Sequence, residues 1–225
     1  MDALPVGSFA HDSLLSRQPR LFIWQPKFFM KTYFFMNFCR VALVTGASKG
    51  IGAQTAIMLA RHQAVVAVNF HHAADRAEAI VKHITSFGGR AISVQADVSD
   101  TAQVARMIGE IREAFGDVDI LVNNAAPPTS PAPFRTTGWE KWQQDLEVMI
   151  HGTHNCIMAV LEGMVAKKSG RIINIISTYT LGAPPVQLAS YVTAKSGLTG
   201  LSRALASELG PLGVTVNMVA PGLTD

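Results

Sequence analysis

Residues 41–52 read Val-Ala-Leu-Val-Thr-Gly-Ala-Ser-Lys-Gly-Ile-Gly, an apolar run that leads directly into a glycine-rich turn. The apolar run is typical of a buried strand, and a helical pattern follows the turn up to His62. Glycines let the backbone turn sharply and approach a ligand closely. The helix N-terminus then offers free amides and a positive dipole end to a pyrophosphate. The stretch predicts a dinucleotide-binding turn, in which the cofactor contacts are Gly46, Ser48, Lys49, Gly50, Ile51 and Gly52.

Apolar runs and amphipathic stretches alternate along the rest of the chain. Strands are expected at 41–45, 64–69, 91–96, 120–122, 171–177 and 214–219, and helices at 51–62, 75–87, 101–115, 139–167 and 188–209. Apolar strands that are each followed by a helix imply a parallel sheet covered on both faces. We therefore expect an α/β, three-layer Rossmann-like fold with a mostly parallel sheet. Its dinucleotide-binding catalytic domain spans residues 41–225, after an irregular or targeting N-terminal extension over residues 1–40.

The basic character of the chain is confined to its beginning. Residues 1–40 hold five of the 19 Lys and Arg side chains and two of the 16 acidic ones, so residues 41–225 hold 14 of each. A neutral domain lacks the excess of cations that nucleic-acid binding requires, so we expect no nucleic-acid partner. The basic, serine-containing extension suits either an organellar transit peptide or a segment without a selected role. We expect a cytoplasmic protein, with organellar import as the alternative.

Other compositional features exclude further classes of protein. A hydrophobic content of 48% with 16% charged residues describes a folded chain with a sizeable core. No run of 18 apolar residues occurs, so no membrane span is expected. The two cysteines, Cys39 and Cys156, lie far apart and are interpreted as reduced thiols.

A tyrosine, a lysine and a serine in the second half of the chain predict a proton-transfer site. Tyr191 and Lys195 are four residues apart and thus share a helical face, and Ser177 lies upstream. An adjacent ammonium favours phenolate, so we expect Lys195 to lower the pKa of Tyr191. The serine hydroxyl can hold a substrate oxygen in line with the phenol. Tyr179 is a weaker candidate because Ala183 stands at its own i+4 position.

The end of the second predicted strand indicates the type of dinucleotide. NAD sites often carry an acid there for the ribose 2′-hydroxyl, whereas this strand ends Val68-Asn69-Phe70-His71-His72. Without the acid, and with Lys49 in the turn and His71 nearby, a 2′-phosphate fits better. We expect NADP(H) rather than NAD(H). The alternative is that Lys49 is merely solvated and His71 is a surface residue.

Taken together, these motifs resemble the short-chain dehydrogenase/reductase family in its single-domain form, from about Val41 onward. The glycine turn and the set Ser177, Tyr191 and Lys195 match in order and spacing. Further matches imply cofactor contacts at Asp97, Val98, Asn123, Ala125, Pro221, Gly222 and Thr224, with Tyr191 and Lys195 also touching the cofactor.

The resemblance implies hydride transfer between a nicotinamide and a carbonyl or alcohol carbon. Tyr191 would act as acid/base, Ser177 would polarise the substrate oxygen, and Lys195 would bind the nicotinamide ribose. Similarity to 3-oxoacyl-carrier-protein reductases leaves an acyl-carrier-linked substrate open. Family members pair through the helices here expected at 139–167 and 188–209, which implies a homodimer or homotetramer. His151 and His154 lack a third ligand, so no metal is expected.

Two departures from the family pattern affect these expectations. Met149 stands where the family often has a catalytic asparagine, and His151 is a substitute to consider. The family continues beyond the position of Asp225, so we expect a sheet without its last strand and with the sixth strand as an exposed edge. The alternatives are a catalytically impaired nucleotide-binding protein or dimerisation partner, and an unstable fragment. Substrate contacts are expected from the loop at 127–134 and the segment at 181–188, in an apolar pocket lined by Pro184, Pro185 and Leu188.

Overall fold

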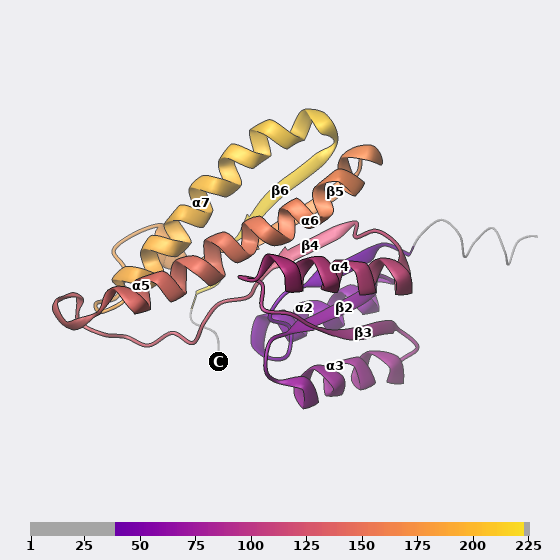
Figure 1. Ribbon diagram of the computed structural model, residues 1–225, viewed down its shortest axis with the longest axis horizontal. Helices are drawn as coiled ribbons and strands as arrows, with labels where there is room; N and C mark the ends of the chain where they lie inside the picture. Colours follow the sequence, from indigo (N-terminus) through magenta and orange to yellow (C-terminus); the bar gives the residue numbers. More distant parts are fainter. Residues whose placement is uncertain (1–38, 223–225) are drawn as a thin grey trace, which may run out of the picture. The chain divides into compact units, whose positions relative to one another are not determined.

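Six strands form a single sheet in which every neighbouring pair runs parallel. The structure is a computed structural model that describes residues 39–222. The strands are β1 (Val41–Val44), β2 (Val65–Phe70), β3 (Arg90–Gln95), β4 (Ile120–Asn123), β5 (Gly170–Ile175) and β6 (Val214–Val219). The helices are α2 (Gly50–Arg61), α3 (Ala74–Ser86), α4 (Thr101–Phe115), α5 (Trp139–Leu146), α6 (Gly152–Ala166) and α7 (Ala189–Leu209). Figure 1 shows the strands and helices alternating along the chain, as the sequence predicts.

The order of the strands fixes where a ligand can bind. From one edge to the other the order is β3-β2-β1-β4-β5-β6, so the chain moves outward from β1 to β3 and then returns to place β4 beside β1. In open parallel sheets, ligands bind beyond the carboxyl ends of the strands where the order reverses. That position lies between the ends of β1 and β4. The glycine-rich turn follows β1 directly and therefore begins at this edge.

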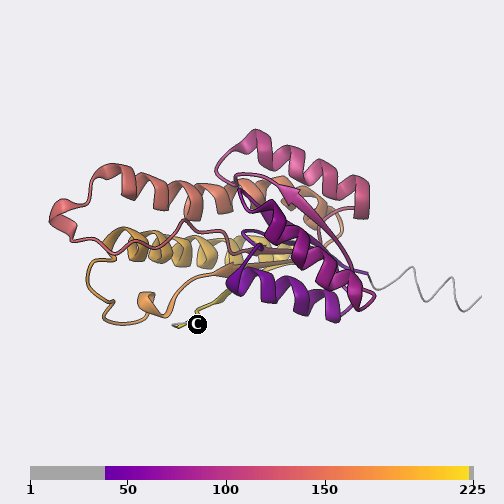
Figure 2. The same cartoon turned by 90° about the horizontal axis from the view of Figure 1, so that it is seen from below.

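The sheet is covered on both faces by separate hydrophobic cores. Alternate residues of β1 point to opposite faces: Val41 and Leu43 join one core, and Ala42 and Val44 join the other. The first core is completed by buried residues of α4, α6 and the end of α7, and the second by α2 and α3. In Figure 2, α4 and α6 lie on one side of the sheet and α2 and α3 on the other. The three-layer α/β fold is confirmed.

The ends of two helices have a local cause in the sequence. Asp100 caps α4, since its Oδ1 accepts hydrogen bonds from the amides of Ala102 at 2.9 Å and Gln103 at 3.0 Å. Gly88 follows α3 with φ +84°, a conformation that glycine adopts without strain. Within residues 39–222 no helix is both long and apolar enough to cross a bilayer.

The long helix expected at 139–167 is divided in the structure. Between α5 and α6 lies a π-helical turn at Glu147–His151, in which Met149 is buried. A π-turn inserts one extra residue but keeps helical spacing on either side, so the apolar pattern of the sequence does not reveal it. The sixth strand lies at the edge of the described sheet, as expected, and Val219 near its end is exposed.

Candidate active site

A cleft of about 1120 Å³ lies at the carboxyl ends of the strands. Most of the residues singled out in the sequence line it, although they come from both halves of the chain. These are Gly46, Ser48, Lys49, Gly50, Ile51, His71, Asp97, Val98, Ala125, Ser177, Tyr191, Lys195, Pro221 and Gly222. The structure thus brings the predicted phosphate-binding turn and the predicted proton-transfer residues into one cavity.

The glycines of the turn are required for different physical reasons. Gly46 and Gly50 have φ values of +60° and +56°, where side chains are strained. A Cβ on Gly46 would lie 2.9 Å from Ala125 Cα, and one on Gly52 would lie 2.5 Å from Asn124 Nδ2. A Cβ on Gly50 would meet no heavy atom within 4 Å, so no other residue covers the backbone on this side of Gly50. Gly46 and Gly52 therefore allow close packing, whereas Gly50 leaves the backbone open to the cleft.

The first turn of α2 has the features of an anion-binding site. Its N-cap residue, Lys49, makes no side-chain capping bond, and the first turn holds no acidic residue. The amides of this turn thus have no side-chain acceptor from the cap and face no repelling carboxylate within their own turn. With the bare backbone at Gly50, they fit the pyrophosphate of a dinucleotide.

The end of β4 holds the glycine-rich turn in place. Thr45 Oγ1 accepts hydrogen bonds from the amides of Asn124 at 3.0 Å and Ala125 at 3.1 Å. In return, Asn124 Nδ2 donates to the carbonyl oxygens of Thr45 at 2.9 Å and Gly46 at 3.1 Å. The side chain of Asn124 therefore connects the two loops at the point where the strand order reverses.

Two predicted cofactor contacts do not line the cleft. Gly52 lies behind the turn, where the absence of a side chain makes room for the amide of Asn124. Asn123 is buried, and its Nδ2 donates a 2.9 Å hydrogen bond to Asn174 Oδ1 on the neighbouring strand. Asn124, which follows the last residue of β4, lines the cleft instead. Thr224 lies outside the described residues.

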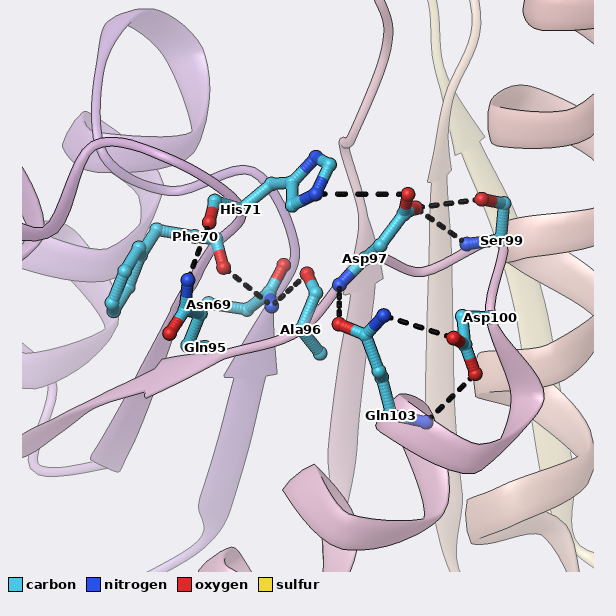
Figure 3. Close-up of polar contacts among 9 residues, drawn as sticks. All are labelled: Asn69, Phe70, His71, Gln95, Ala96, Asp97, Ser99, Asp100 and Gln103. Atoms are coloured by element: carbon cyan, nitrogen blue, oxygen red, sulfur yellow. Dashed lines mark hydrogen bonds and ion pairs between the residues drawn. The ribbon is translucent and has the colours of Figure 1, made fainter.

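Asn69 near the end of β2 is a site residue that the sequence reasoning did not select. Its side chain is 1% exposed, its Oδ1 accepts from the amide of Gly46 at 3.1 Å, and its Nδ2 donates to Ala96 O at 3.1 Å. Figure 3 shows this amide reaching from β2 to the end of β3. A lone asparagine within the apolar strand Val65–Phe70 was the signal available in the sequence.

His71 and Asp97 face each other across the cleft wall at 3.7 Å (Figure 3). Burial disfavours the charged form of Asp97, but hydrogen bonds from Ser99 and the nearby His71 outweigh it, and the pKa of Asp97 is lowered. Ser99 donates to Asp97 Oδ1 from its hydroxyl at 2.7 Å and from its amide at 2.9 Å. The Asp97 carboxylate therefore competes with any bound phosphate for His71. Lys49, also in the cleft, makes no salt bridge with another described residue.

Ser177, Tyr191 and Lys195 meet at the other end of the cleft. Ser177 follows β5, and its Oγ accepts a 3.2 Å hydrogen bond from the amide of Tyr179. Tyr191 lies in the first turn of α7, and Lys195 lies one turn further along the same helix. Lys195 is 3% exposed, its Nζ donates to Ile175 O at 2.6 Å, and it lies 5.9 Å from the ring centroid of Tyr191.

The protonation of this pair differs from the expectation. Burial lowers the pKa of Lys195 to about 8. Burial also raises the pKa of Tyr191, with further contributions from Tyr179 and Asp145, and these outweigh the hydrogen bond with Ser177 that lowers it. The expected lowering by Lys195 is wrong for this structure. The reason is that desolvation dominates, and the ammonium is bound to the carbonyl of Ile175.

The substrate end of the cleft is only partly as expected. Leu188 lines it, but Pro184 and Pro185 do not, so the pocket wall assigned to these two prolines is wrong. The loop that follows β4 lines the cleft as expected, and residues near the π-turn complete this wall: Pro127, Pro128, Thr129, Pro131, Gln144, Glu147 and Val148. Met149 is buried rather than in the cleft, and His151 Nδ1 lies 2.9 Å from Glu147 Oε2.

Comparisons with known proteins agree with this geometry. The chain is 42% identical over 183 residues to 3-oxoacyl-[acyl-carrier-protein] reductase of Synechocystis, covering 81% of this chain and 73% of that protein. It is 41% identical over 184 residues to a subunit of (2S)-[(R)-hydroxy(phenyl)methyl]succinyl-CoA dehydrogenase of Thauera aromatica, covering 82% and 73%. A short-chain dehydrogenase of Burkholderia cenocepacia, solved in complex with NADP, aligns with a TM-score of 0.76 at 36% identity, covering 83% of this chain and 75% of that one.

A family-level comparison covers the whole described domain. The model of the family described as short chain dehydrogenase matches residues 40–225. The matched region includes the glycine-rich turn and the residues of both ends of the cleft. This chain is therefore a member of the short-chain dehydrogenase/reductase family, and it resembles the 3-oxoacyl-carrier-protein reductases within it.

Proposed function

We propose that this protein is an NADP(H)-dependent oxidoreductase that interconverts a carbonyl compound and its secondary alcohol. The observation that carries the proposal is the gathering of Ser177, Tyr191 and Lys195 in the same cleft as a bare glycine-rich turn. The turn suits a dinucleotide, and the three side chains supply what is needed to handle a proton on a substrate oxygen.

The residues of the cleft fit a nicotinamide dinucleotide at one end and a substrate at the other. The amides at the start of α2 would hold the pyrophosphate, and Asp97 with Val98 would contact the adenine end. When bound, the reduced nicotinamide supplies the hydride. NADP(H) is favoured because β2 ends in Asn69 and Phe70 with no acid following, while Lys49 offers a cation. The related Burkholderia enzyme was solved with NADP, which supports the same choice.

The chain's own residues would direct the proton during reduction. Ser177 Oγ, positioned by the amide of Tyr179, would donate a hydrogen bond to the substrate carbonyl oxygen. Tyr191 has a raised pKa and is therefore a neutral phenol that can donate its proton to that oxygen as the alcohol forms. Lys195 would hydrogen-bond the ribose of the cofactor near this proton. In oxidation the same groups would act in reverse, with Tyr191 accepting the proton.

The substrate class proposed is a 3-oxoacyl thioester. One similar protein is named for a 3-oxoacyl group on an acyl carrier protein, and another for a succinyl-CoA derivative. Both names describe acyl thioesters. The apolar part of the cleft wall, formed by Pro127, Pro128, Pro131 and Leu188, suits an acyl chain.

The test is oxidation of NADPH by the purified protein with acetoacetyl-CoA as a 3-oxoacyl thioester, alongside a panel of simple ketones. We expect turnover with the thioester, and faster turnover with NADPH than with NADH. Binding of NADPH, measured by calorimetry, should accompany it. Binding without turnover of any carbonyl compound would contradict the oxidoreductase assignment.

A second function is favoured by one observation, the buried methionine in the π-turn. The resemblance to the family implies a catalytic asparagine where Met149 stands, and Met149 is buried in the π-turn. A thioether cannot bind a relay water as an amide does. A nucleotide-binding protein with impaired catalysis would follow from this substitution. Met149→Asn would then increase turnover without changing the affinity for NADPH.

A further inference from the structure

The substrate end of the cleft carries a carboxylate, that of Glu147 in the π-turn. Its side chain is 46% exposed, and it lines the cleft together with Gln144 and Val148. The other acidic residue in the lining of the cleft, Asp97, lies at the cofactor end beside His71. The rest of the wall around Glu147 consists of apolar and uncharged polar residues, so a charge at this place requires an explanation.

Contacts between helices place Glu147 on the same side of the cleft as the proton donor of the proposed function. The π-turn that begins at Glu147 packs against α7, the helix that carries Tyr191. Two residues before Glu147, the buried Asp145 accepts a 2.7 Å hydrogen bond at Oδ2 from Ser190 Oγ. Ser190 directly precedes Tyr191. This bond holds the π-turn against the first turn of α7, next to the place where a substrate oxygen would meet the phenol.

A histidine outside the cleft holds the carboxylate of Glu147. His151 Nδ1 lies 2.9 Å from Glu147 Oε2, four residues further along the chain. His151 itself does not line the cleft. Among residues 39–222, the carboxylate makes no other hydrogen bond or ion pair. The negative charge is therefore anchored at the wall without a partner from inside the cleft.

Within the described part of the chain, no exposed cation at the substrate end balances this charge. The basic residues that line the cleft are Lys49, His71, His72 and Lys195. The first three belong to the glycine-rich turn and the end of β2, where the cofactor is proposed to bind. Lys195 is 3% exposed, and its Nζ donates a hydrogen bond to Ile175 O. An acid group on a substrate would find no free cation beside Glu147.

The N-terminus of α7 is the other feature at this end that favours a negative charge, through the helix dipole. Asp145 already provides an anion there, since Ser190 in the first turn of α7 is bound to its Oδ2. Lys141 Nζ, which lies 2.6 Å from Asp145 Oδ1, does not line the cleft. A second carboxylate, brought in by a substrate, would gain little from this helix end and would be repelled by Glu147.

We infer that Glu147 is a specificity-determining residue that excludes acyl chains with a free carboxylate, so that the enzyme takes 3-oxoacyl thioesters with an uncharged chain. An unpaired like charge in a binding site is an effective way to reject a wrong substrate. The inference rests on the proposed function, because it assumes that an acyl chain lies along this wall. It also separates two similar proteins, since the succinyl group in the name of the Thauera protein carries a second carboxylate and the 3-oxoacyl group in the name of the Synechocystis protein does not require one.

The experiment compares two thioesters that differ in one carboxylate. The acyl chains of 3-oxohexanoyl-CoA and 3-oxoadipyl-CoA are equally long, and the second ends in a carboxylate. The value of kcat/KM with NADPH is measured for each in the wild type, Glu147→Gln and Glu147→Lys, at pH 8, where an ordinary imidazole carries no charge. We expect the wild type to prefer the uncharged chain by about tenfold or more. The preference should fall by about threefold or more in Glu147→Gln, and further in Glu147→Lys.

Controls separate an effect of charge from an effect of structure. Glu110→Gln removes an exposed carboxylate of α4 outside the cleft and should keep the wild-type preference. Added KCl should weaken the preference of the wild type more than that of Glu147→Gln, because salt screens charges. Should the variants of Glu147 fail to fold, this salt dependence in the wild type decides the question. A ratio that stays constant in the folded variants, or in the wild type with added salt, would overturn the inference.

A binding measurement distinguishes failure of this inference from failure of the proposed function. Hexanoyl-CoA and adipyl-CoA differ by the same charge and need no reduction in order to bind. If no carbonyl compound is reduced, the proposed function fails, and calorimetric titration of the protein with NADP⁺ and each of these thioesters still measures the preference. Equal affinity ratios in the wild type and Glu147→Gln, or binding of neither thioester, would show that Glu147 does not select the acyl chain.

Discussion

Lys195 Nζ donates a 2.6 Å hydrogen bond to the backbone carbonyl oxygen of Ile175, the last residue of β5. The bond attaches α7 to the carboxyl end of the sheet and brings a buried amine into the cleft beside Tyr191. Burial of this amine is costly, since its pKa falls to about 8. The cleft is therefore maintained at some expense of stability, as is common for functional sites.

The lowered pKa of Lys195 predicts a pH dependence of folding. Between about 8, its folded value, and 10.5, its ordinary value, the unfolded chain binds a proton that the folded chain has released. Stability therefore rises with pH across this window, by on the order of 3 kcal/mol in total. Denaturant unfolding at several pH values should show a steeper rise in the free energy of unfolding for the wild type than for Lys195→Met. Equal slopes for the two proteins would refute this expectation.

Substitution of Gly46 should disturb both folding and cofactor binding. Gly46→Ala places a Cβ 2.9 Å from Ala125 Cα at a φ of +60°, so we expect a loss of about 2 kcal/mol or more in the free energy of unfolding. The affinity for NADPH should fall as well. Gly109→Ala is the matched control: this glycine lies inside α4, and its Cβ would meet no heavy atom within 4 Å. Alanine there should stabilise the protein by about 0.5–1 kcal/mol. Denaturant unfolding should therefore find Gly109→Ala more stable than the wild type and Gly46→Ala less stable. The reverse order would contradict this expectation.

Asn69 should prove important although it is buried beneath the cofactor cleft. Asn69→Leu leaves the amide of Gly46 and the carbonyl of Ala96 without their side-chain partner, which costs about 1–3 kcal/mol for a buried group. Because the side-chain amide of Asn69 also holds the glycine-rich turn, the affinity for NADPH should weaken in parallel. Calorimetric titration with NADPH measures the second effect. Unchanged affinity in a folded variant would show that Asn69 does not shape the turn.

The assignment of NADP(H) predicts a specific role for Lys49. Lys49→Ala should weaken binding of NADPH by about tenfold, in keeping with one lost charged contact, and should leave binding of NADH nearly unchanged. Lys82→Ala, on the exposed surface of α3 outside the cleft, is the matched control and should alter neither affinity. Equal losses for NADPH and NADH in Lys49→Ala would count against a contact with the 2′-phosphate.

Much of the fold could be predicted because its signals are local and repeated. Each apolar strand is followed by a helical pattern. The glycine-rich turn at 45–52, between a strand and a helix, is typical of a dinucleotide-binding site. The π-turn at Glu147–His151 could not be predicted, since one inserted residue leaves the apolar spacing of α5 and α6 intact. The π-turn contacts α7 in the folded chain, and the local sequence does not specify that contact.

Site residues could be predicted where both members of a pair lie on one helix, because their spacing in the sequence then fixes their relative positions. Tyr191 and Lys195 share one helix, so their spacing alone places them together. The buried hydrogen bond from Ser190 to Asp145 could not be predicted in this way, because the two residues are 45 positions apart and the helices α5 and α7 meet only in the folded chain. The sign of the pKa shift of Tyr191 was mispredicted for the same reason: burial is a property of the packed structure.

The central claim is that Tyr191 is the proton donor in a cleft that also holds the dinucleotide. It is tested most directly by the rate of NADPH oxidation with acetoacetyl-CoA in Tyr191→Phe and in Tyr179→Phe, which removes a second hydroxyl from the same cleft. The account predicts a loss of at least about a hundredfold in Tyr191→Phe and a rate within about threefold of the wild type in Tyr179→Phe. A Tyr191→Phe protein that still binds NADPH and turns over at the wild-type rate would contradict it.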